Sequence, residues 1–185
     1  MPLLITGATG HLGRLVVEQL LAAGGPAGDI IATGRATDKI NDLADRGVQV
    51  RAVDFGDPAA VRAAVAVADR VLLVSALDPG DRVAQHRNVI DAAREAGVGL
   101  VAYTSIVNAG TARIALAADH QATEQLLRDS GVPYVLLRNG WYHENYTDRL
   151  PAFLAQGAIP GSAGEGRISA AARADYAAAA VRVLT

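Results

Sequence analysis

A glycine-rich turn near the start of the chain constrains the fold most strongly. The residues Thr-Gly-Ala-Thr-Gly-His-Leu-Gly at positions 6–13 follow an apolar run and lead into a helical pattern of apolar residues. In this setting Gly7 allows a sharp turn, Gly10 lets a pyrophosphate approach the backbone, and Gly13 lets the helix pack close to the strand. The free N–H groups at a helix start attract phosphate. The pattern favours a dinucleotide-binding turn over its alternative, a plain flexible glycine turn.

The rest of the chain alternates apolar runs with helical patterns. The expected strands are residues 3–6, 30–33, 48–53, 70–75, 100–104 and 134–137, and the expected helices are residues 13–23, 37–46, 58–67, 82–96 and 115–130. The apolar runs are continuous, which is typical of strands covered on both faces. Several expected helices run into a glycine, namely Gly24, Gly47, Gly97 and Gly131. The sequence therefore predicts an α/β fold with a Rossmann-like, doubly wound parallel sheet, in one domain over residues 1–185.

The last part of the chain has a different pattern. Residues 157–166 hold four glycines and a proline, which predicts a loop with room for a short hairpin. Residues 170–184 are rich in alanine and are expected to form one helix.

Composition narrows the class of protein. The 185 residues are 51% hydrophobic, carry a net charge of −2 and include no cysteine. This excludes disulfides and thiol chemistry, and it gives no reason to expect nucleic acid, a membrane surface or a metal. The first apolar run is too short for a signal peptide, so we expect a cytoplasmic location. Association of two copies into a homodimer is compatible with this composition.

The residue after the second expected strand indicates which dinucleotide is bound. An enzyme that prefers NAD carries a carboxylate there, but this chain has Arg35. An arginine fork suits the 2′-phosphate of NADP, and Lys39, the only lysine, follows one helical turn later. NADP is therefore favoured over NAD, the alternative being that Arg35 is an ordinary surface arginine.

Two further strand ends are expected to contact the cofactor. Asp54 and Phe55 follow the third strand, where Asp54 would accept from the adenine amino group or, in competition with Asp57, cap the next helix. The small residues Ser75 and Ala76, with Leu77, follow the fourth strand, and they leave room for the nicotinamide ribose at the crevice of the sheet.

These residues resemble a known family. Residues 6–13, Arg35, Gln-His-Arg-Asn-Val-Ile at 85–90 and Tyr-Thr-Ser at 103–105 are similar to the NmrA-like atypical short-chain dehydrogenases. The segment Leu-Arg-Asn-Gly-Trp-Tyr-His-Glu-Asn-Tyr at 137–146, with Arg-Ala-Asp-Tyr at 173–176, resembles the type 2 NAD(P)H:quinone oxidoreductases. The resemblance implies NADPH binding and transfer of a hydride to a quinone-like acceptor. Some NmrA-like proteins bind NADP without turnover as redox sensors, which is the alternative function.

The resemblance also implies a domain boundary. Members of this family usually continue well beyond this length and close a lobe over the substrate. We therefore expect residues 139–185 to begin an incomplete substrate-binding lobe, truncated before its usual C-terminal part. A methyltransferase also begins with a glycine-rich turn, but Arg35 and the glycine spacing disfavour it.

The catalytic pair of ordinary short-chain dehydrogenases is missing. They use Tyr-x-x-x-Lys to protonate an alkoxide, and Lys39 lies far from that position. The equivalent helix carries His120 and Glu124, one turn apart, either as a proton relay or as a structural pair. Reduction of a quinone yields a weakly basic oxygen that water can protonate, so the missing pair favours a quinone over a ketone.

Aromatic residues gather after the sixth expected strand. Three of the chain's eight aromatic side chains, Trp141, Tyr142 and Tyr146, fall within six positions. They are expected to stack a flat acceptor, or else to form a hydrophobic plug. The candidate catalytic residues are Tyr142, Asn145 and His120. The candidate cofactor-binding residues are Gly7, Ala8, Thr9, Gly10, His11, Leu12, Gly13, Arg35, Asp54, Phe55, Ser75, Ala76, Leu77, Asn139, Gly140, Trp141, Tyr142, His143, Glu144 and Asn145.

Three other polar side chains are interpreted structurally. His86 and Asn88 lie on the helix after the fourth strand, where hydrogen bonds from helix to loop are the favoured interpretation. Tyr176, in the last expected helix, is expected to pack.

Overall fold

The central sheet has six parallel strands. In the computed structural model, which describes residues 1–76 and 81–185, their spatial order is β3-β2-β1-β4-β5-β6. The strands are β1 (Leu3–Ile5), β2 (Ile30–Gly34), β3 (Gln49–Ala52), β4 (Arg70–Leu73), β5 (Leu100–Ile106) and β6 (Tyr134–Asn139). The order reverses at β1, which pairs with β2 on one side and β4 on the other. The predicted doubly wound Rossmann-like sheet is confirmed.

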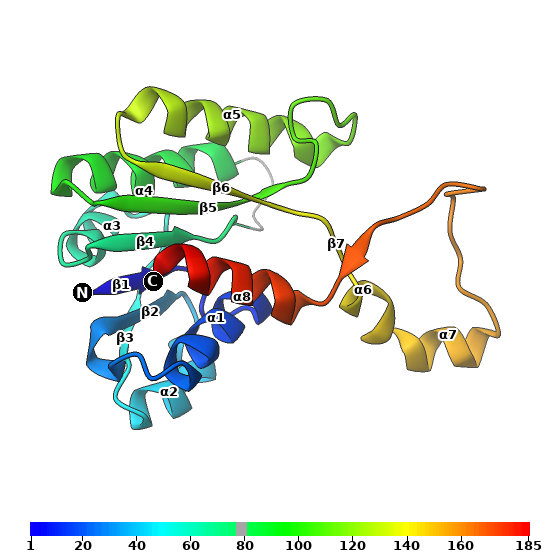
Figure 1. Cartoon of the computed structure of the whole chain (residues 1–185), viewed down its shortest axis with the longest axis horizontal. Coiled ribbons are helices and arrows are strands. Elements are labelled where there is room, and N and C mark those ends of the chain that lie inside the picture. Colours follow the sequence, from blue (N-terminus) through cyan, green and yellow to red (C-terminus); the bar gives the residue numbers. More distant parts are fainter. Residues whose placement is uncertain (77–80) are drawn as a thin grey trace.

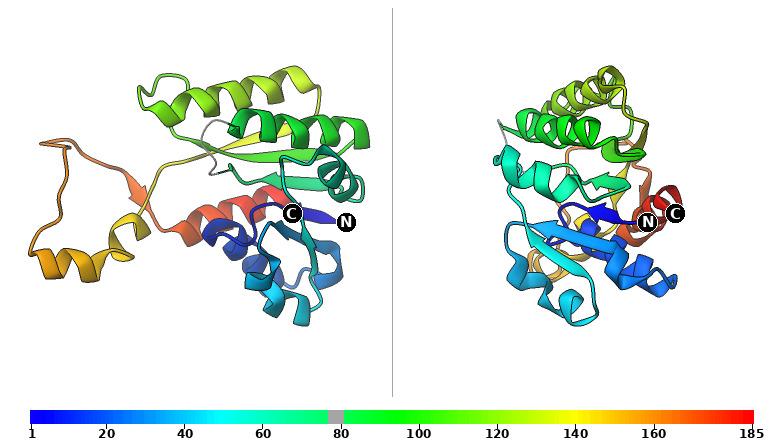
Figure 2. Two further views of the ribbon diagram at one scale, coloured as in Figure 1. Left: turned by 180° about the vertical axis from the view of Figure 1, so that it is seen from behind. Right: turned by 90° about the vertical axis from the view of Figure 1, so that its left-hand side faces the viewer.

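Helices cover both faces of this sheet. They are α1 (His11–Ala22), α2 (Asn41–Asp45), α3 (Pro58–Val65), α4 (Arg82–Ala96), α5 (Ala115–Ser130) and α8 (Arg173–Leu184), with 3₁₀ turns η1 (Ala27–Asp29) and η2 (Thr37–Ile40). Helices α3, α4 and α5 lie side by side over one face, and α1 and α8 pack together over the other (Figures 1 and 2). The helix expected over residues 37–46 is thus divided between η2 and α2, whereas α4 and α5 have the predicted bounds.

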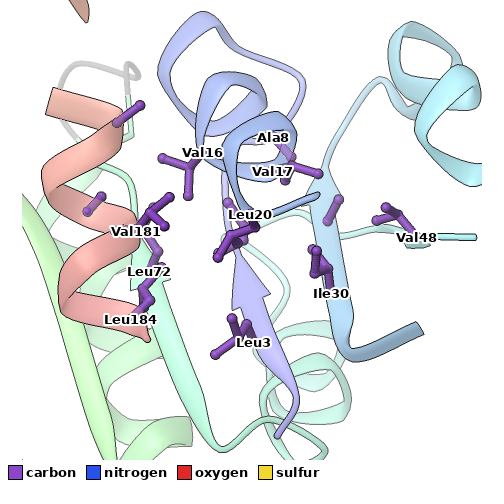
Figure 3. Close-up of a cluster of buried hydrophobic side chains, with 14 of the residues drawn as sticks. Leu3, Ala8, Val16, Val17, Leu20, Ile30, Val48, Leu72, Val181 and Leu184 are labelled. Carbon is purple, nitrogen blue, oxygen red and sulfur yellow. The ribbon is translucent and has the colours of Figure 1, made fainter. Parts of the chain in front are cut away.

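The last helix completes one of the two hydrophobic cores. Figure 3 shows Val181 and Leu184 of α8 beside Leu72 of β4 and Leu20 of α1, all of them buried. Small residues on the inner face of α8, Ala177 and Ala180 among them, are also fully buried. Their size lets α8 approach α1 closely, so the alanine-rich composition serves packing as well as helix formation.

The start of this helix differs from the prediction. Residues Ala170–Ala171 form strand β8, which pairs in parallel with β7 (Trp141–Tyr142), and the helix begins only at Arg173. Helix propensity is a weak preference, and here backbone pairing with a distant segment overrides it.

One segment projects from the body of the molecule. Helices α6 (Glu144–Thr147) and α7 (Leu150–Gln156), which the sequence pattern did not predict, and the chain that follows extend away from the sheet (Figures 1 and 2). Residues 157–166 contain no helix or strand, so the predicted loop is confirmed and the short hairpin is wrong. Among the described residues, no helix combines the length and the apolar character needed to cross a bilayer.

Candidate functional site

The glycine turn between β1 and α1 has the geometry that its spacing predicts. Gly7 adopts a positive φ of 61°, which disfavours any residue with a side chain. A β-carbon on Gly13 would lie 2.4 Å from the carbonyl oxygen of Gly7, so only glycine fits where the helix meets the turn. Within the turn, the N–H of Gly10 donates to the same carbonyl oxygen at 2.9 Å. Backbone hydrogen bonds and close packing therefore hold this turn in one shape.

The start of α1 is open toward a ligand. Gly10 is its N-cap residue and provides no side-chain cap. The next residues, His11, Leu12 and Gly13, line a cavity. Because the first N–H groups of a helix have no partner within it and carry partial positive charge, this end suits a phosphate.

This cavity runs along the carboxyl ends of the strands and has a volume of about 1000 Å³. Each strand of the main sheet contributes residues at or just after its carboxyl end, from Gly7 after β1 to Asn139 at the end of β6. The predicted site residues that line it are Gly7, Thr9, Gly10, His11, Leu12, Gly13, Arg35, Asp54, Phe55, Ser75, Ala76, His120, Asn139, Gly140, Trp141, Tyr142 and Asn145. One cavity therefore brings together predicted site residues that are up to 138 positions apart, from Gly7 to Asn145.

The charges around the cavity are mostly positive. Among the described residues, its lining includes four arginines, Arg35, Arg82, Arg167 and Arg173, and one carboxylate, that of Asp54. A cleft lined by one sign of charge concentrates ligands of the opposite sign. The lining therefore fits a ligand that carries several phosphates.

The ends of β2 and β3 line the part of the cavity for which the sequence predicts contacts to the adenosine half of a cofactor. Arg35 is exposed on the cavity wall directly after Gly34, where any β-carbon would collide with Thr9 at 2.5 Å. Lys39 does not line the cavity, and its carbonyl oxygen accepts a hydrogen bond from Nη1 of Arg14.

The competition between two carboxylates for the cap of α3 is settled by the structure. Asp57 is the cap, because its Oδ1 accepts from the N–H groups of Ala59 and Ala60. Asp54 instead accepts from the N–H of Gly56 and stays exposed at the cavity edge. Its place is compatible with contact to an adenine amino group.

The end of β4 is held by side chains from neighbouring elements. The N–H of Ser75 donates to Oγ1 of Thr104 at 2.8 Å, and the N–H of Ala76 donates to Nε2 of His86 at 3.0 Å. The side-chain amide of Asn88 donates to the carbonyl oxygen of Phe55. The structural interpretation of His86 and Asn88 is thereby confirmed, whereas Leu77 lies outside the described residues.

Behind the cavity wall lies a buried polar cluster. Nδ1 of His86 bonds Oγ1 of Thr123 at 2.9 Å, so both ring nitrogens of this fully buried histidine have partners. Burial, together with the charges of His120 and Arg82, lowers the pKa of His86 to about 3. The hydroxyl of Tyr103 lies 2.7 Å from Nδ1 of His120, and burial raises the pKa of this tyrosine to about 12.

The side chain of Glu124 is held by hydrogen bonds within the protein. Its carboxylate accepts two hydrogen bonds from Arg138, one from Ser105 and one from Arg128, and it is almost fully buried. These bonds, that from Arg138 foremost, lower its pKa to about 2. A carboxylate held ionised in this way does not exchange protons with His120 near neutral pH, so the structural interpretation of Glu124 holds.

The aromatic segment follows β6, the edge strand of the main sheet, whereas the glycine turn follows the inner strand β1. Trp141 is 49% exposed on the cavity wall. Tyr142 is half-buried, its hydroxyl accepts from the amide of Asn139 at 3.1 Å, and its ring packs against Tyr176 and under the guanidinium of Arg173. Burial raises the pKa of Tyr142, so this phenol stays protonated near neutral pH.

Tyr176 packs as predicted and also makes a hydrogen bond to the backbone. Its hydroxyl accepts a hydrogen bond from the N–H of Gly140 at 3.0 Å. Since Tyr176 belongs to α8, this contact ties the last helix to the chain between β6 and β7.

Three predicted cofactor residues lie outside the cavity lining. Ala8 is fully buried and its N–H donates to the carbonyl oxygen of Thr33. His143 is exposed to solvent outside the cavity. Both carboxylate oxygens of Glu144 accept from the N–H of Arg173 at the start of α8.

The cavity also includes residues that the sequence did not predict as site residues, although Gln85, Thr104, Ser105 and Arg173 belong to the segments that carry the family resemblance. The apolar ones are Ile106, Val107, Ile114, Leu116 and Ile168, and the polar ones are Arg82, Gln85, Thr104, Ser105, Asn108, Arg167, Ser169 and Arg173. Most lie after β5 or on the projecting segment, where no motif marks them. Among the described residues, no group of three or more histidine, aspartate or glutamate side chains is arranged to hold a metal ion.

Comparison with known proteins agrees with this geometry. A family model described as NAD(P)H-binding matches residues 7–185. Quinone oxidoreductase 2 of Escherichia coli is 50% identical over 181 residues, which are 98% of this chain and 63% of that protein. The resemblance seen in the sequence is thereby confirmed, and the chain spans somewhat less than two thirds of the length of this relative.

Two solved structures share the fold closely. The crystal structure of an NADPH-dependent quinone oxidoreductase from Escherichia coli, complexed with NADPH, matches with a TM-score of 0.93 and 49% identity over 99% of this chain and 64% of that one. The triphenylmethane reductase of Citrobacter sp., complexed with NADP(H), matches with a TM-score of 0.94 and 40% identity over 100% of this chain and 66% of that one.

Proposed function

The chain belongs to the NAD(P)H-binding family, and on that premise we propose that it is an NADPH-dependent oxidoreductase that reduces a quinone-like acceptor. The proposal rests on one cavity that is lined both by the glycine turn and by the Trp141 segment. The similarity to a quinone oxidoreductase that binds NADPH supports both the cofactor and the class of acceptor.

The cofactor would lie along the carboxyl ends of the strands. The N-terminus of α1, with Gly10 as its cap, would bind the pyrophosphate, and Arg35 would bind the 2′-phosphate. Ser75 and Ala76 leave space for the nicotinamide ribose. When bound there, NADPH supplies a hydride.

The protein would then contribute mainly by positioning the acceptor. Trp141 offers a flat face, while Asn145 and the protonated Tyr142 offer hydrogen bonds to acceptor oxygens. Ile114, Leu116 and Ile168 add apolar side chains to the cavity lining, which suit a flat, apolar acceptor. Because the reduced quinone is weakly basic, solvent can complete its protonation without a Tyr-Lys pair.

A direct assay tests the proposal. The absorbance of NADPH is followed after addition of a benzoquinone, with NADPH alone and quinone without protein as controls. We expect protein-dependent oxidation of NADPH. Tight NADPH binding without turnover would contradict the enzyme and favour a redox sensor of the NmrA-like type.

The organisation of the whole protein belongs to the same proposal. We expect residues 139–185 to form part of a substrate-binding lobe, and the exposed Leu154, Ile159 and Ile168 on the projecting segment support this. A homodimer and a cytoplasmic location remain predictions from the sequence, and the mass of the native assembly in solution tests the first.

A further inference from the structure

Two buried side chains with hydrogen-bonding capacity face the cavity from neighbouring helices. Arg82 begins α4 and is 7% exposed, and His120 lies in α5 and is 3% exposed. Both line the cavity. Asp119, the residue before His120, accepts a hydrogen bond from Nη1 of Arg82 at 2.8 Å. Asp119 and His120 are consecutive in α5, and the charge of Arg82 is near enough to His120 to help lower the pKa of its imidazole.

The guanidinium group of Arg82 is held from two sides. Its Nε donates to the carbonyl oxygen of Ala76 at 2.6 Å, in addition to the bond from Nη1 to Asp119. Within the described part of the chain, these contacts use Nε and Nη1 and leave Nη2 available. The Asp119 side chain is 35% exposed, so water weakens its neutralising effect, whereas the arginine side chain is 8% exposed.

His120 is held so that one ring nitrogen is left for the cavity. Its Nδ1 is engaged by the hydroxyl of Tyr103 on the core side. Burial raises the pKa of Tyr103 to about 12, so its hydroxyl is protonated and able to donate to Nδ1. Burial and the charge of Arg82 lower the pKa of His120, which favours the neutral ring. When Tyr103 donates to Nδ1, the hydrogen of the neutral ring lies on Nε2, and in that tautomer His120 offers an N–H donor.

We propose that Arg82 and His120 form an oxyanion site that binds the reduced acceptor. The inference rests on the proposed function: a quinone that accepts a hydride from NADPH, which becomes NADP⁺, is left with one negatively charged oxygen until water protonates it. A fixed cation and an N–H donor stabilise such a charge as it develops. Tyr103 is a positioning residue in this arrangement, because its hydroxyl bonds Nδ1 of His120 at 2.7 Å.

The proposal has a consequence for acceptor selectivity. A quinone gains negative charge on hydride transfer, whereas a cationic triphenylmethane dye becomes neutral. Arg82 therefore favours the first acceptor and disfavours the second, so the ratio of the two activities reports its charge.

A binding experiment tests the site without turnover. 4-Nitrophenol is titrated into protein saturated with NADP⁺ at several pH values, and the absorbance of the bound phenolate is recorded. We expect the wild-type protein to bind the phenolate at least about tenfold more tightly than the phenol, since a nearby cation lowers a ligand pKa by about one unit or more. Arg82→Gln abolishes this preference, and Arg82→Lys retains part of it.

Asp119→Asn is the matched control. It breaks the same ion pair but leaves the arginine charge uncompensated, so phenolate binding is expected to stay equal or become tighter. If Arg82 served only to hold α4 against α5, both Arg82→Gln and Asp119→Asn would weaken binding alike, and that result would overturn the proposal. Thermal melting curves identify any variant that fails to fold, in which case Arg82→Lys against Asp119→Asn carries the comparison.

An activity experiment separates this inference from the proposed function. Arg82→Gln is expected to lower kcat/KM for benzoquinone by about 100-fold, as for loss of an oxyanion donor, while reduction of crystal violet stays the same or rises. An equal fall for both acceptors, or no fall for benzoquinone, would overturn the oxyanion site and leave the quinone reductase intact. Phenolate binding that depends on Arg82, in a protein that oxidises no NADPH with quinone, would refute the reductase and leave the anion site standing.

Discussion

The two parts of the cavity that we propose for the cofactor phosphates (the phosphate end) and for the acceptor (the acceptor end) are built in different ways. The phosphate end consists of consecutive residues, Gly7 to Gly13, and acts through backbone N–H groups and the absence of side chains. The acceptor end is assembled from side chains of α4, α5, β7 and α8, such as Arg82, His120, Trp141 and Arg173. A short local motif can therefore specify the first end, whereas only the completed fold creates the second.

The ends also differ in how much protein stability depends on them. The glycine turn is part of the packing between β1 and α1, since Gly13 touches the backbone of Gly7. At the acceptor end, Trp141 and Ile114 are 49% and 59% exposed. Substitutions are thus expected to damage the fold at the phosphate end and reactivity at the acceptor end.

The buried His86 is expected to make the protein sensitive to acid. The folded-state pKa of His86, about 3, lies below its unfolded value near 6.5, so the unfolded chain takes up a proton first. Stability is therefore complete above about pH 6.5 and is lost as the pH falls toward 3, by on the order of 4 kcal/mol in total. Urea unfolding curves across this range measure the loss.

His86→Gln is the variant that isolates this contribution. The slope of unfolding free energy against pH is expected to fall by about 1.4 kcal/mol per pH unit relative to wild type. An unchanged slope would assign the acid sensitivity to other groups, such as Glu124, whose pKa is also low.

Gly13→Ala is expected to destabilise the phosphate end and with it the whole fold. The new β-carbon would lie 2.4 Å from the carbonyl oxygen of Gly7, and the backbone must move, at a cost of about 3 kcal/mol. Gly10→Ala is the matched control, because its β-carbon would lie 3.3 Å from the same oxygen. Thermal denaturation should show a large fall for the first variant and a small one for the second; equal falls would contradict the packing argument.

Arg35→Asp is expected to change cofactor choice without changing the fold. Loss of the cation and gain of a carboxylate beside the 2′-phosphate should weaken NADPH binding by about 100-fold and NADH binding far less. Isothermal titration with both cofactors measures the difference. Equal weakening of the two would remove the assignment of Arg35 to the phosphate.

Trp141→Ala is expected to affect the acceptor end alone. Loss of a stacking face should raise KM for a benzoquinone by about tenfold, while NADPH affinity and melting temperature stay nearly unchanged. Steady-state kinetics and a melting curve test this. A strong fall in melting temperature would instead identify Trp141 as a hydrophobic plug.

Much of the fold could be predicted because its signals are local. Continuous apolar runs marked all six strands of the main sheet, and glycines marked the ends of α4 and α5, where Gly97 and Gly131 adopt positive φ. The strand β8 and the helices α6 and α7 escaped prediction. Strand β8 exists only because residues 141–142 are brought alongside it, and α6 and α7 are too short to show a clear periodicity.

The same division applies to the site. The amino-acid sequence is enough to recognise the glycine turn, the arginine after β2 and the aromatic segment, because each consists of residues that are neighbours in the chain. Three other features depend on the tertiary structure: Asp57 rather than Asp54 caps α3, arginines bind Glu124, and Arg82 pairs with Asp119. The physical reason is that charge, burial and hydrogen bonding depend on which side chains meet in space, and parallel strands join residues that lie far apart in the sequence.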